Sequence, residues 1–236
     1  MQPAAYHRSI VMLYHAIHSS EPAELYLFTT LQEALARGRK TLWFVSGGST
    51  IALAVTVAAQ LRNHPNIANL TVMQTDERYG KLDHNDANWH ALKQAGFDCG
   101  KATCLPILHG KSLAETTQDY DTALAGALQE NQFKVGLFGI GEDGHTAGIL
   151  PGSPAAAETR RLVVGYDAPD FTRVTITGPA IARFDMAVVY AVGQNKAPAL
   201  ITLQQKVLPI TEQPAQALKQ VKDVDIYTDC KGVDAA

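Results

Sequence analysis

Residues 41–63 read TLWFVSGGSTIALAVTVAAQLRN, in which a short apolar run, a glycine-rich loop and a longer apolar run follow one another. The first run, residues 41–45, has the length and continuous hydrophobicity of a strand buried on both faces. The last part, residues 50–63, has the spacing of apolar residues typical of a helix. A strand, a tight loop and a helix in this order are the repeating part of a parallel α/β sheet.

The same alternation runs through the rest of the chain, and no shift in composition or internal repeat marks a second domain. We therefore expect one α/β domain over residues 1–236, with a mostly parallel twisted sheet and helices on both faces in a Rossmann-like, three-layer arrangement. Prolines and alanines at residues 151–157 predict a surface excursion. The other strand-like runs are residues 70–75, 134–140, 162–164, 173–177, 186–192 and 224–228, and the other helical patterns are residues 24–39, 86–95, 113–130 and 196–207.

The composition is that of an ordinary globular protein, with 46% hydrophobic and 18% charged residues among 236. The net charge of −3 provides no basic field for a phosphate backbone, so we expect no nucleic-acid partner. No apolar run approaches the ~20 residues of a membrane span. Cys99, Cys104 and Cys230 form an odd set without the spacing of a metal or redox motif, which favours reduced thiols in a cytoplasmic protein, and we assign them no role.

In open α/β sheets, ligands bind beyond the carboxyl ends of the strands, where three loops of this chain stand out, residues 46–50, 76–79 and 139–152. In the first loop, Gly47, Gly48, Ser49 and Thr50 precede a helix, whose unpaired amides and dipole favour an anion such as phosphate. The plain alternative is an N-cap in which Ser49 or Thr50 satisfies those amides.

The second loop places Asp76 and Arg78 at the lip of the same edge. The Arg78 guanidinium suits a phosphate, a carboxylate or a developing oxyanion, whereas the plain alternative is a solvated loop end with an internal ion pair. Arg173 begins a strand and Lys196 begins a helix, and singly each is typical of a solvated surface. Together with the glycine loop, they predict side-chain charges for one phosphate, and Lys196 in particular opposes the helix dipole without an anionic partner.

The third loop, GIGEDGHTAGILPG at residues 139–152, places His145 two residues after Asp143 in a glycine turn. An imidazole with a pKa near ~6.5 accepts a proton at neutral pH, and this position favours a catalytic histidine over a structural one. The G-x-G-x-x-G match at residues 139–144 does not predict dinucleotide binding, because Pro151 and Pro154 interrupt the helix that it should open. Ser46 lacks the Gly-x-Ser-x-Gly elbow of a serine hydrolase.

Together, the motifs at residues 46–50, 76–78, 88, 139–152, 173–177 and 193–197 resemble the 6-phosphogluconolactonase family, within a wider group that includes glucosamine-6-phosphate deaminases and isomerases. The resemblance implies hydrolysis of 6-phospho-D-glucono-1,5-lactone in the oxidative pentose phosphate pathway, without metal or cofactor. The sequence leaves both a monomer and a homodimer open. The resemblance also implies that His145 is the general base, with Asp143 as its neighbour and Arg78 as the cationic group near the lactone, and we add Asp76 as a further catalytic candidate. The implied phosphate ligands are Gly47, Gly48, Ser49, Thr50, Arg173 and Lys196.

Two alternatives stay open. A sugar-phosphate deaminase or isomerase shares the glycine loops, although that branch looks like Asp-Glu-Tyr at the second loop, where this chain has Arg78, and carries a later acid after the histidine that is absent here. A non-catalytic phosphosugar sensor would use the same loops for binding alone. Ile51, Gly80 and Gly148 depart from the usual lactonase pattern and bear on the shape of the pocket.

Overall fold

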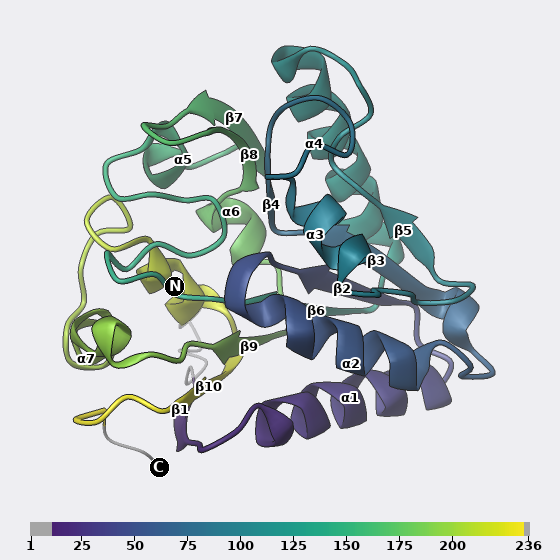
Figure 1. Ribbon diagram of the computed structural model, residues 1–236, viewed down its shortest axis with the longest axis horizontal. Coiled ribbons are helices and arrows are strands. Elements are labelled where there is room, and N and C mark those ends of the chain that lie inside the picture. The colour runs from purple at the N-terminus through teal and green to yellow at the C-terminus, as the bar shows by residue number, and fades with distance from the viewer. Residues whose placement is uncertain (1–10, 234–236) are drawn as a thin grey trace, which may run out of the picture.

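The computed structural model describes residues 11–233 and contains a seven-stranded sheet in the order β1-β10-β9-β6-β2-β3-β5 (Figure 1). Every pair of neighbouring strands in this sheet is parallel. The α/β class and the Rossmann-like arrangement are therefore confirmed. The strands are β1 (Val11–Ala16), β2 (Thr41–Val45), β3 (Leu70–Gln74), β5 (Thr103–Leu105), β6 (Phe133–Phe138), β9 (Met186–Tyr190) and β10 (Asp223–Thr228).

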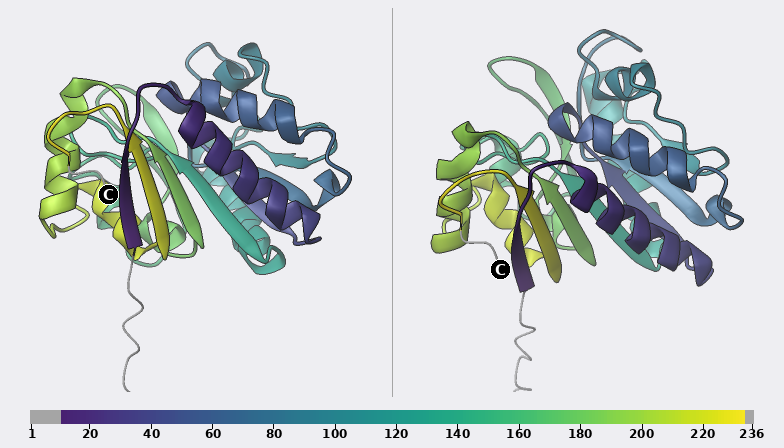
Figure 2. Two further views of the ribbon diagram at one scale, coloured as in Figure 1. Left: turned by 90° about the horizontal axis from the view of Figure 1, so that it is seen from below. Right: turned by 60° about the horizontal axis from the view of Figure 1, so that its bottom comes forward.

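Helices cover both faces of the sheet. On one face α1 and α2 lie side by side across the strands, as Figure 2 shows, and Trp43 and Val45 of β2 point into this layer. Leu42 and Phe44 point to the opposite face, where α4 packs. Because successive strand residues alternate between faces, a strand covered on both sides is apolar throughout, as β2 is. The helices are α1 (Glu21–Ala36), α2 (Ile51–Leu61), α3 (Asn88–Gln94), α4 (Leu113–Glu130), α5 (Pro154–Ala157), α6 (Gly178–Ile181) and α7 (Ala197–Gln205).

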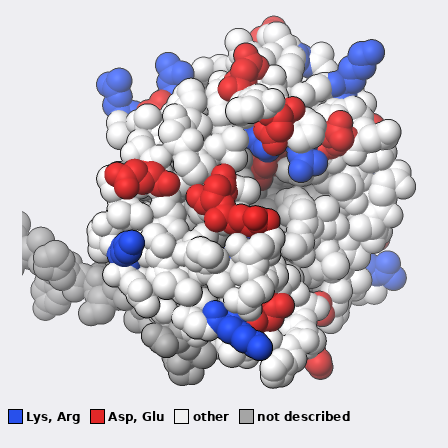
Figure 3. Space-filling model, turned by 60° about the vertical axis from the view of Figure 1, so that its left-hand side comes forward, with Lys and Arg blue, Asp and Glu red and all other residues white. Residues whose placement is uncertain are grey.

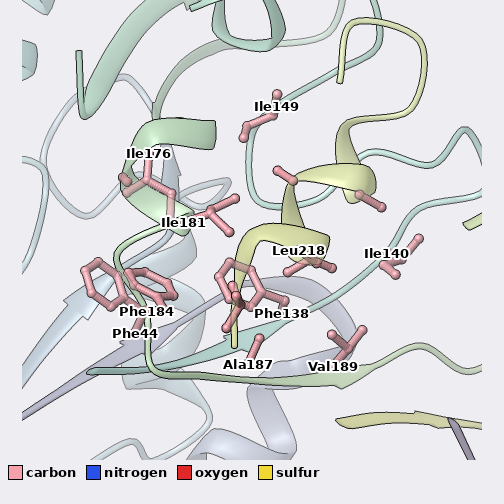
Figure 4. Packing of buried hydrophobic residues seen from close by; sticks show 14 of the residues in the cluster. Phe44, Phe138, Ile140, Ile149, Ile176, Ile181, Phe184, Ala187, Val189 and Leu218 are labelled. Carbon is pink, nitrogen blue, oxygen red and sulfur yellow. The ribbon is translucent and has the colours of Figure 1, made fainter. Parts of the chain in front are cut away.

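The core on the α4 face continues under the second half of the chain. The rings of Phe44 and Phe184 stack with centroids 4.6 Å apart, and Phe138 lies 5.7 Å from Phe184 (Figure 4). Aromatic side chains bury large areas and favour offset contacts of this kind. The packing fixes the end of β6, and with it the start of the glycine loop that follows Phe138.

A second, antiparallel sheet contains β4 (Asp76–Arg78), β8 (Thr172–Ile176) and β7 (Val163–Asp167), with β8 in the middle. Residues 76–79 were expected to be a loop, and their first three residues form β4 instead. The strands expected at residues 162–164 and 173–177 exist, but they belong to this small sheet. The sequence also did not predict β1 or β5. The predicted surface excursion at residues 151–157 is wrong at Ala155 and Ala156, which are buried.

The topology creates a crevice between β2 and β6. After β2, the chain moves through α2 to β3 and β5 at one edge, whereas after β6 it moves to β9 on the other side. Loops that leave two neighbouring strands in opposite directions leave a gap at their carboxyl ends, which is the usual ligand position in open sheets. No helix within residues 11–233 is both long and apolar enough to cross a bilayer.

Candidate active site

A pocket of about 660 Å³ opens at this crevice. Figure 3 shows a face of the molecule that is hollowed near its centre, with acidic and basic side chains gathered around the hollow. Loops from both halves of the sheet and from the second sheet supply the walls. The lining residues include Gly47, Gly48, Ser49, Asp76, Arg78, Asn88, Glu142, Asp143, His145, Leu150, Asp170, Arg173 and Lys196.

The glycine loop after β2 forms one wall. Gly48 adopts a left-handed φ of +67°, and residues 48–50 make a 3₁₀ turn that leads into α2. The first amides of a helix lack partners within the helix, so they are available to an anion at this wall. Gly47 packs so closely that a Cβ there would lie 2.2 Å from the Asn88 Oδ1.

The hydroxyls that flank this loop hold the backbone. Thr50 is fully buried and does not line the pocket, and its Oγ1 donates hydrogen bonds to the carbonyls of Ser46 and Gly47 at 3.0 and 3.1 Å. The Ser46 hydroxyl is buried, donates to the Leu137 carbonyl at 2.9 Å and lies 2.6 Å from the Thr75 hydroxyl. These contacts leave Gly47, Gly48 and Ser49 to present the wall.

Strand β4 places its alternate side chains on opposite sides. Asp76 and Arg78 face the pocket, whereas Glu77 is fully buried and accepts hydrogen bonds from the backbone amides of Arg78 and Trp89 at 2.8 Å and of Asn88 at 2.5 Å. Glu77 therefore satisfies the amide groups at the start of α3. Sequence analysis did not assign this role to Glu77, because nothing in the sequence distinguishes it from the two charged residues beside it.

The Asp76 carboxyl lies at the floor of the pocket. Its Oδ1 accepts from the Thr75 hydroxyl at 2.9 Å, and its Oδ2 accepts from the Asn88 Nδ2 at 3.3 Å. Burial raises the pKa of Asp76 because the charged form loses its hydration, while the Thr75 hydrogen bond and the nearby charges of Arg173, His145 and Arg78 oppose that rise. A buried carboxyl of this kind is typical of a functional site.

Two arginines lie opposite each other in the second sheet, since Arg78 of β4 pairs with Arg173 of β8. The Phe171 ring lies 4.8 Å from the Arg78 guanidinium and 5.7 Å from that of Arg173. Arg173 donates to the Asp170 Oδ2 at 2.6 Å, and its Nε is buried and has no hydrogen-bond partner within the described chain. Like charges in register repel, so this pair favours an anion between or beside them.

The histidine loop after β6 forms the wall opposite. The His145 Nδ1 donates to the Asp143 Oδ1 at 2.6 Å, and the same oxygen accepts from the His145 amide at 3.0 Å. The ring packs over Gly141, where a Cβ would lie 2.2 Å from Nδ1. With its proton on Nδ1, the imidazole keeps a free lone pair on Nε2. The side chain is 39% exposed and lines the pocket, so this nitrogen is available to a ligand.

The same loop is tied to the second sheet. The Gly148 amide donates to the Thr175 hydroxyl at 3.0 Å, and the Tyr166 hydroxyl donates to the Gly148 carbonyl at 2.7 Å. A Cβ at Gly148 would lie 2.9 Å from the Thr175 Cβ and 3.0 Å from the Asp76 Cβ. Glycine at this departure from the usual pattern therefore allows the loop to lie directly against β4 and β8.

Lys196 lines the pocket together with the two arginines, Arg78 and Arg173. It is half-buried just before α7, and burial lowers the pKa of its ammonium group, an effect that electrostatic interactions with Cys230, Asp229 and Glu142 partly offset. The neighbouring Asn195 donates a hydrogen bond to Glu142 in the histidine loop.

Nine of the ten residues predicted for the site line one pocket, and Thr50 is buried behind the pocket wall. Within residues 11–233, no cluster of three or more His, Cys, Asp or Glu residues is arranged to hold a metal ion.

Comparison with known proteins gives a consistent result. A family model described as glucosamine-6-phosphate isomerases/6-phosphogluconolactonase matches residues 18–227. The probable 6-phosphogluconolactonase of Drosophila melanogaster is 32% identical over 177 residues, which cover 70% of this chain and 70% of that protein. The glucosamine-6-phosphate deaminase of Streptococcus thermophilus is 26% identical over 219 residues, which cover 86% of this chain and 90% of that protein.

Solved structures show the same fold. The crystal structure of 6-phosphogluconolactonase from Thermotoga maritima has a TM-score of 0.80 at 18% identity and covers 92% of this chain and 99% of that one. A monomeric glucosamine-6-phosphate deaminase has a TM-score of 0.75 at 17% identity and covers 92% of this chain and 97% of that one. Both branches therefore share this fold, and the choice between them depends on the residues of the pocket.

Proposed function

Because the chain belongs to the family of glucosamine-6-phosphate isomerases and 6-phosphogluconolactonases, we propose that it hydrolyses 6-phospho-D-glucono-1,5-lactone to 6-phosphogluconate. The observation that carries this proposal is one pocket that contains the His145–Asp143 pair, Arg78, Arg173 and Lys196. Such a pocket offers a base and several cations to an anionic ester. We propose that a single domain performs the reaction, as expected for residues 1–236, and the family model matches residues 18–227 of this chain.

The substrate phosphate binds to the amides of the glycine loop, with Arg173 and Lys196 supplying the side-chain charges. The Nε2 of His145 removes a proton from water as the water oxygen attacks the lactone carbonyl carbon. Arg78 stabilises the negative charge that develops on the carbonyl oxygen. When the bond from the carbonyl carbon to the ring oxygen breaks, the imidazolium returns its proton to that oxygen, and Asp143 stabilises the imidazolium between the two transfers.

One observation favours a second candidate, a glucosamine-6-phosphate deaminase. Asp76 is a buried carboxyl with a raised pKa at the floor of the pocket, and isomerisation needs a group that moves a proton between adjacent carbons. The lactonase is the better proposal because Arg78 suits an oxyanion. In addition, Asp143, Glu142 and Asp170 are each held by a hydrogen-bond partner, which leaves them less available for a second proton transfer.

The decisive experiment measures lactone hydrolysis by the purified protein above the spontaneous rate, in the presence of a chelator. We expect catalysis in the wild type and a loss of about 10²- to 10⁴-fold in kcat for His145→Asn, the usual contribution of a general base. His109→Asn is the matched control, because His109 is exposed and lies outside the pocket. Full activity in His145→Asn would remove the histidine from the mechanism.

Two further assays of the purified protein distinguish the lactonase from the deaminase and from a phosphosugar sensor. Ammonia release from glucosamine 6-phosphate, without lactone hydrolysis, would identify the deaminase. Binding of 6-phosphogluconate without turnover of either substrate would identify a phosphosugar sensor.

A further inference from the structure

Two of the three cysteines lie in direct contact outside the pocket. The Sγ atoms of Cys99 and Cys104 are 2.8 Å apart, and both thiols are free. Cys230 lies elsewhere, where its thiol donates a hydrogen bond to the Gly193 carbonyl at 3.2 Å. The spacing of Cys99 and Cys104 in the sequence gives no hint of this contact, which depends on the path of the chain between α3 and β5.

A tight turn brings the two thiols together. The Ala102 amide donates to the Cys99 carbonyl at 3.2 Å, and Gly100 adopts a left-handed φ of +60°. A Cβ at Gly100 would lie 2.5 Å from the Arg62 carbonyl oxygen, so the turn packs against the end of α2. Cys104 lies in β5, where it pairs with Val72 of β3. The turn and the sheet together fix both cysteine backbones.

The surroundings of the two thiols differ. Cys99 is 4% exposed and packs into the hydrophobic layer under α1 and α2, whereas Cys104 is only half-buried. The hydrogen bond from Cys99 lowers the pKa of the Cys104 thiol. The same hydrogen bond, together with burial, raises the pKa of Cys99. Cys104 is therefore the thiol that a small reagent reaches first as a thiolate, with Cys99 held against it.

We propose that Cys99 and Cys104 form a reversible disulfide when the protein meets a peroxide. The Cys104 thiolate attacks one peroxide oxygen and becomes a sulfenic acid as the O–O bond breaks, and the other oxygen leaves as hydroxide, which takes up the proton that the thiol released and becomes water. The Cys99 sulfur then attacks the Cys104 Sγ, and the S–O bond breaks as hydroxide leaves with the Cys99 proton as water. Each sulfur loses one electron, and the peroxide is reduced to water. A dithiol reductant reverses the reaction.

The disulfide would close a turn of only a few residues and would leave the pocket walls in place, because neither cysteine lines the pocket. We therefore expect it to form without loss of the activity proposed above. The experiment below measures the free thiols directly, so its result does not depend on whether the lactonase proposal is correct.

The experiment treats the native wild-type protein with hydrogen peroxide, then denatures it and blocks free thiols with N-ethylmaleimide. Untreated protein should carry three adducts by intact mass, and oxidised protein should carry one, at Cys230, with the remaining mass lower by two hydrogen atoms. Dithiothreitol before blocking should restore three. Peptide mapping should recover Cys99 and Cys104 in a single linked peptide.

Three variants sharpen this test. Cys230→Ser should oxidise at Cys99 and Cys104 as the wild type does. Cys99→Ser should stop at a Cys104 sulfenic acid that dimedone traps, and Cys104→Ser should leave Cys99 as a thiol, because Cys99 is buried. Three adducts after oxidation of the wild type would overturn the proposal, and so would disulfide-linked dimers as the main product or modification of Cys230 alone.

Discussion

At the scale of single residues, Asp76 connects the chemistry of the pocket to the stability of the fold. Burial raises its pKa, so the folded protein holds this proton more tightly than the unfolded chain does. The stability that the protonated carboxyl contributes is full at acid pH and is lost as the pH rises through the folded pKa. Above the pKa of the unfolded chain, keeping this carboxyl buried therefore costs the fold stability.

Asp76→Asn removes this titration, because asparagine carries no ionisable group. We expect the free energy of unfolding of the variant to improve relative to the wild type as the pH rises from acid to neutral, while activity falls, in the manner of other stability–function trade-offs. Denaturant unfolding at several pH values measures the difference, with the exposed Asp86→Asn as a control for the loss of one charge. A difference independent of pH, or one that moves toward the wild type, contradicts this account.

We predict that Lys196 sets the alkaline limit of phosphosugar binding. Because burial lowers the pKa of its ammonium, Lys196 loses its charge at a lower pH than an exposed lysine does. The affinity for 6-phosphogluconate should therefore decline as the pH rises into the alkaline range. In Lys196→Arg the decline should be shallower, because a guanidinium stays charged.

Titration calorimetry with 6-phosphogluconate across that range measures both proteins. Lys219→Arg is a matched control, since burial also lowers the pKa of Lys219, but that side chain donates to the Lys206 carbonyl away from the pocket. Identical pH profiles for the wild type and Lys196→Arg would exclude Lys196 as the titrating phosphate ligand.

At the scale of elements, the start of α3 depends on Glu77. One carboxylate oxygen of Glu77 accepts from the amides of Arg78 and Asn88, and the other accepts from the amide of Trp89 and the side chain of Gln74. Every neighbour is a donor, so no neutral amide side chain fits the same place. This arrangement holds Asn88 against Asp76 and closes the pocket floor.

Glu77→Gln places an NH₂ group against two of these donors. We expect a loss of about 1–3 kcal/mol in the free energy of unfolding, the usual cost of leaving a buried polar group without a partner. The measurement is chemical denaturation, and Glu33→Gln on the exposed side of α1 provides the control. Equal stability of the two variants would show that α3 does not need this carboxylate.

The burial of the individual strands explains why the seven-stranded parallel sheet was predicted and the three-stranded antiparallel sheet was not. Strand β2 is buried throughout, and β6 and β9 are buried over most of their length, so their sequences are largely apolar, with Lys134 near the start of β6 as the charged exception. Hydrophobicity was therefore enough to predict the positions of these three strands. By contrast, β4 consists of three charged residues whose extended form depends on pairing with β8. Strand β5 is short and partly exposed, so its sequence lacks a strong pattern. These segments are extended because they pair with strands that are distant in the sequence, and the local sequence carries no pattern that indicates this pairing.

At the scale of the whole molecule, the candidate site could be predicted because the carboxyl ends of parallel strands meet at one edge. Residues 47–49, 76–78 and 139–145 therefore converge even though they lie far apart in the sequence. Asp170, which lines the pocket, and Phe171, which contacts Arg78 and Arg173, had no such signal, because both lie in the turn between β7 and β8 of the second sheet. The contact between Cys99 and Cys104 was equally hidden, since it depends on a turn fixed by α2.

The pocket gathers walls from most of the chain, so a bound phosphosugar should stabilise the fold as a whole. A ligand that binds only the folded protein adds about 2.7 kcal/mol at a concentration one hundred times its Kd. We expect 6-phosphogluconate to raise the melting temperature in thermal unfolding. Gluconate, which lacks the phosphate, should raise it far less, because Arg173, Lys196 and the glycine loop then lack their anion. Equal shifts for the two ligands would mean that the cations around the pocket do not bind the phosphate group.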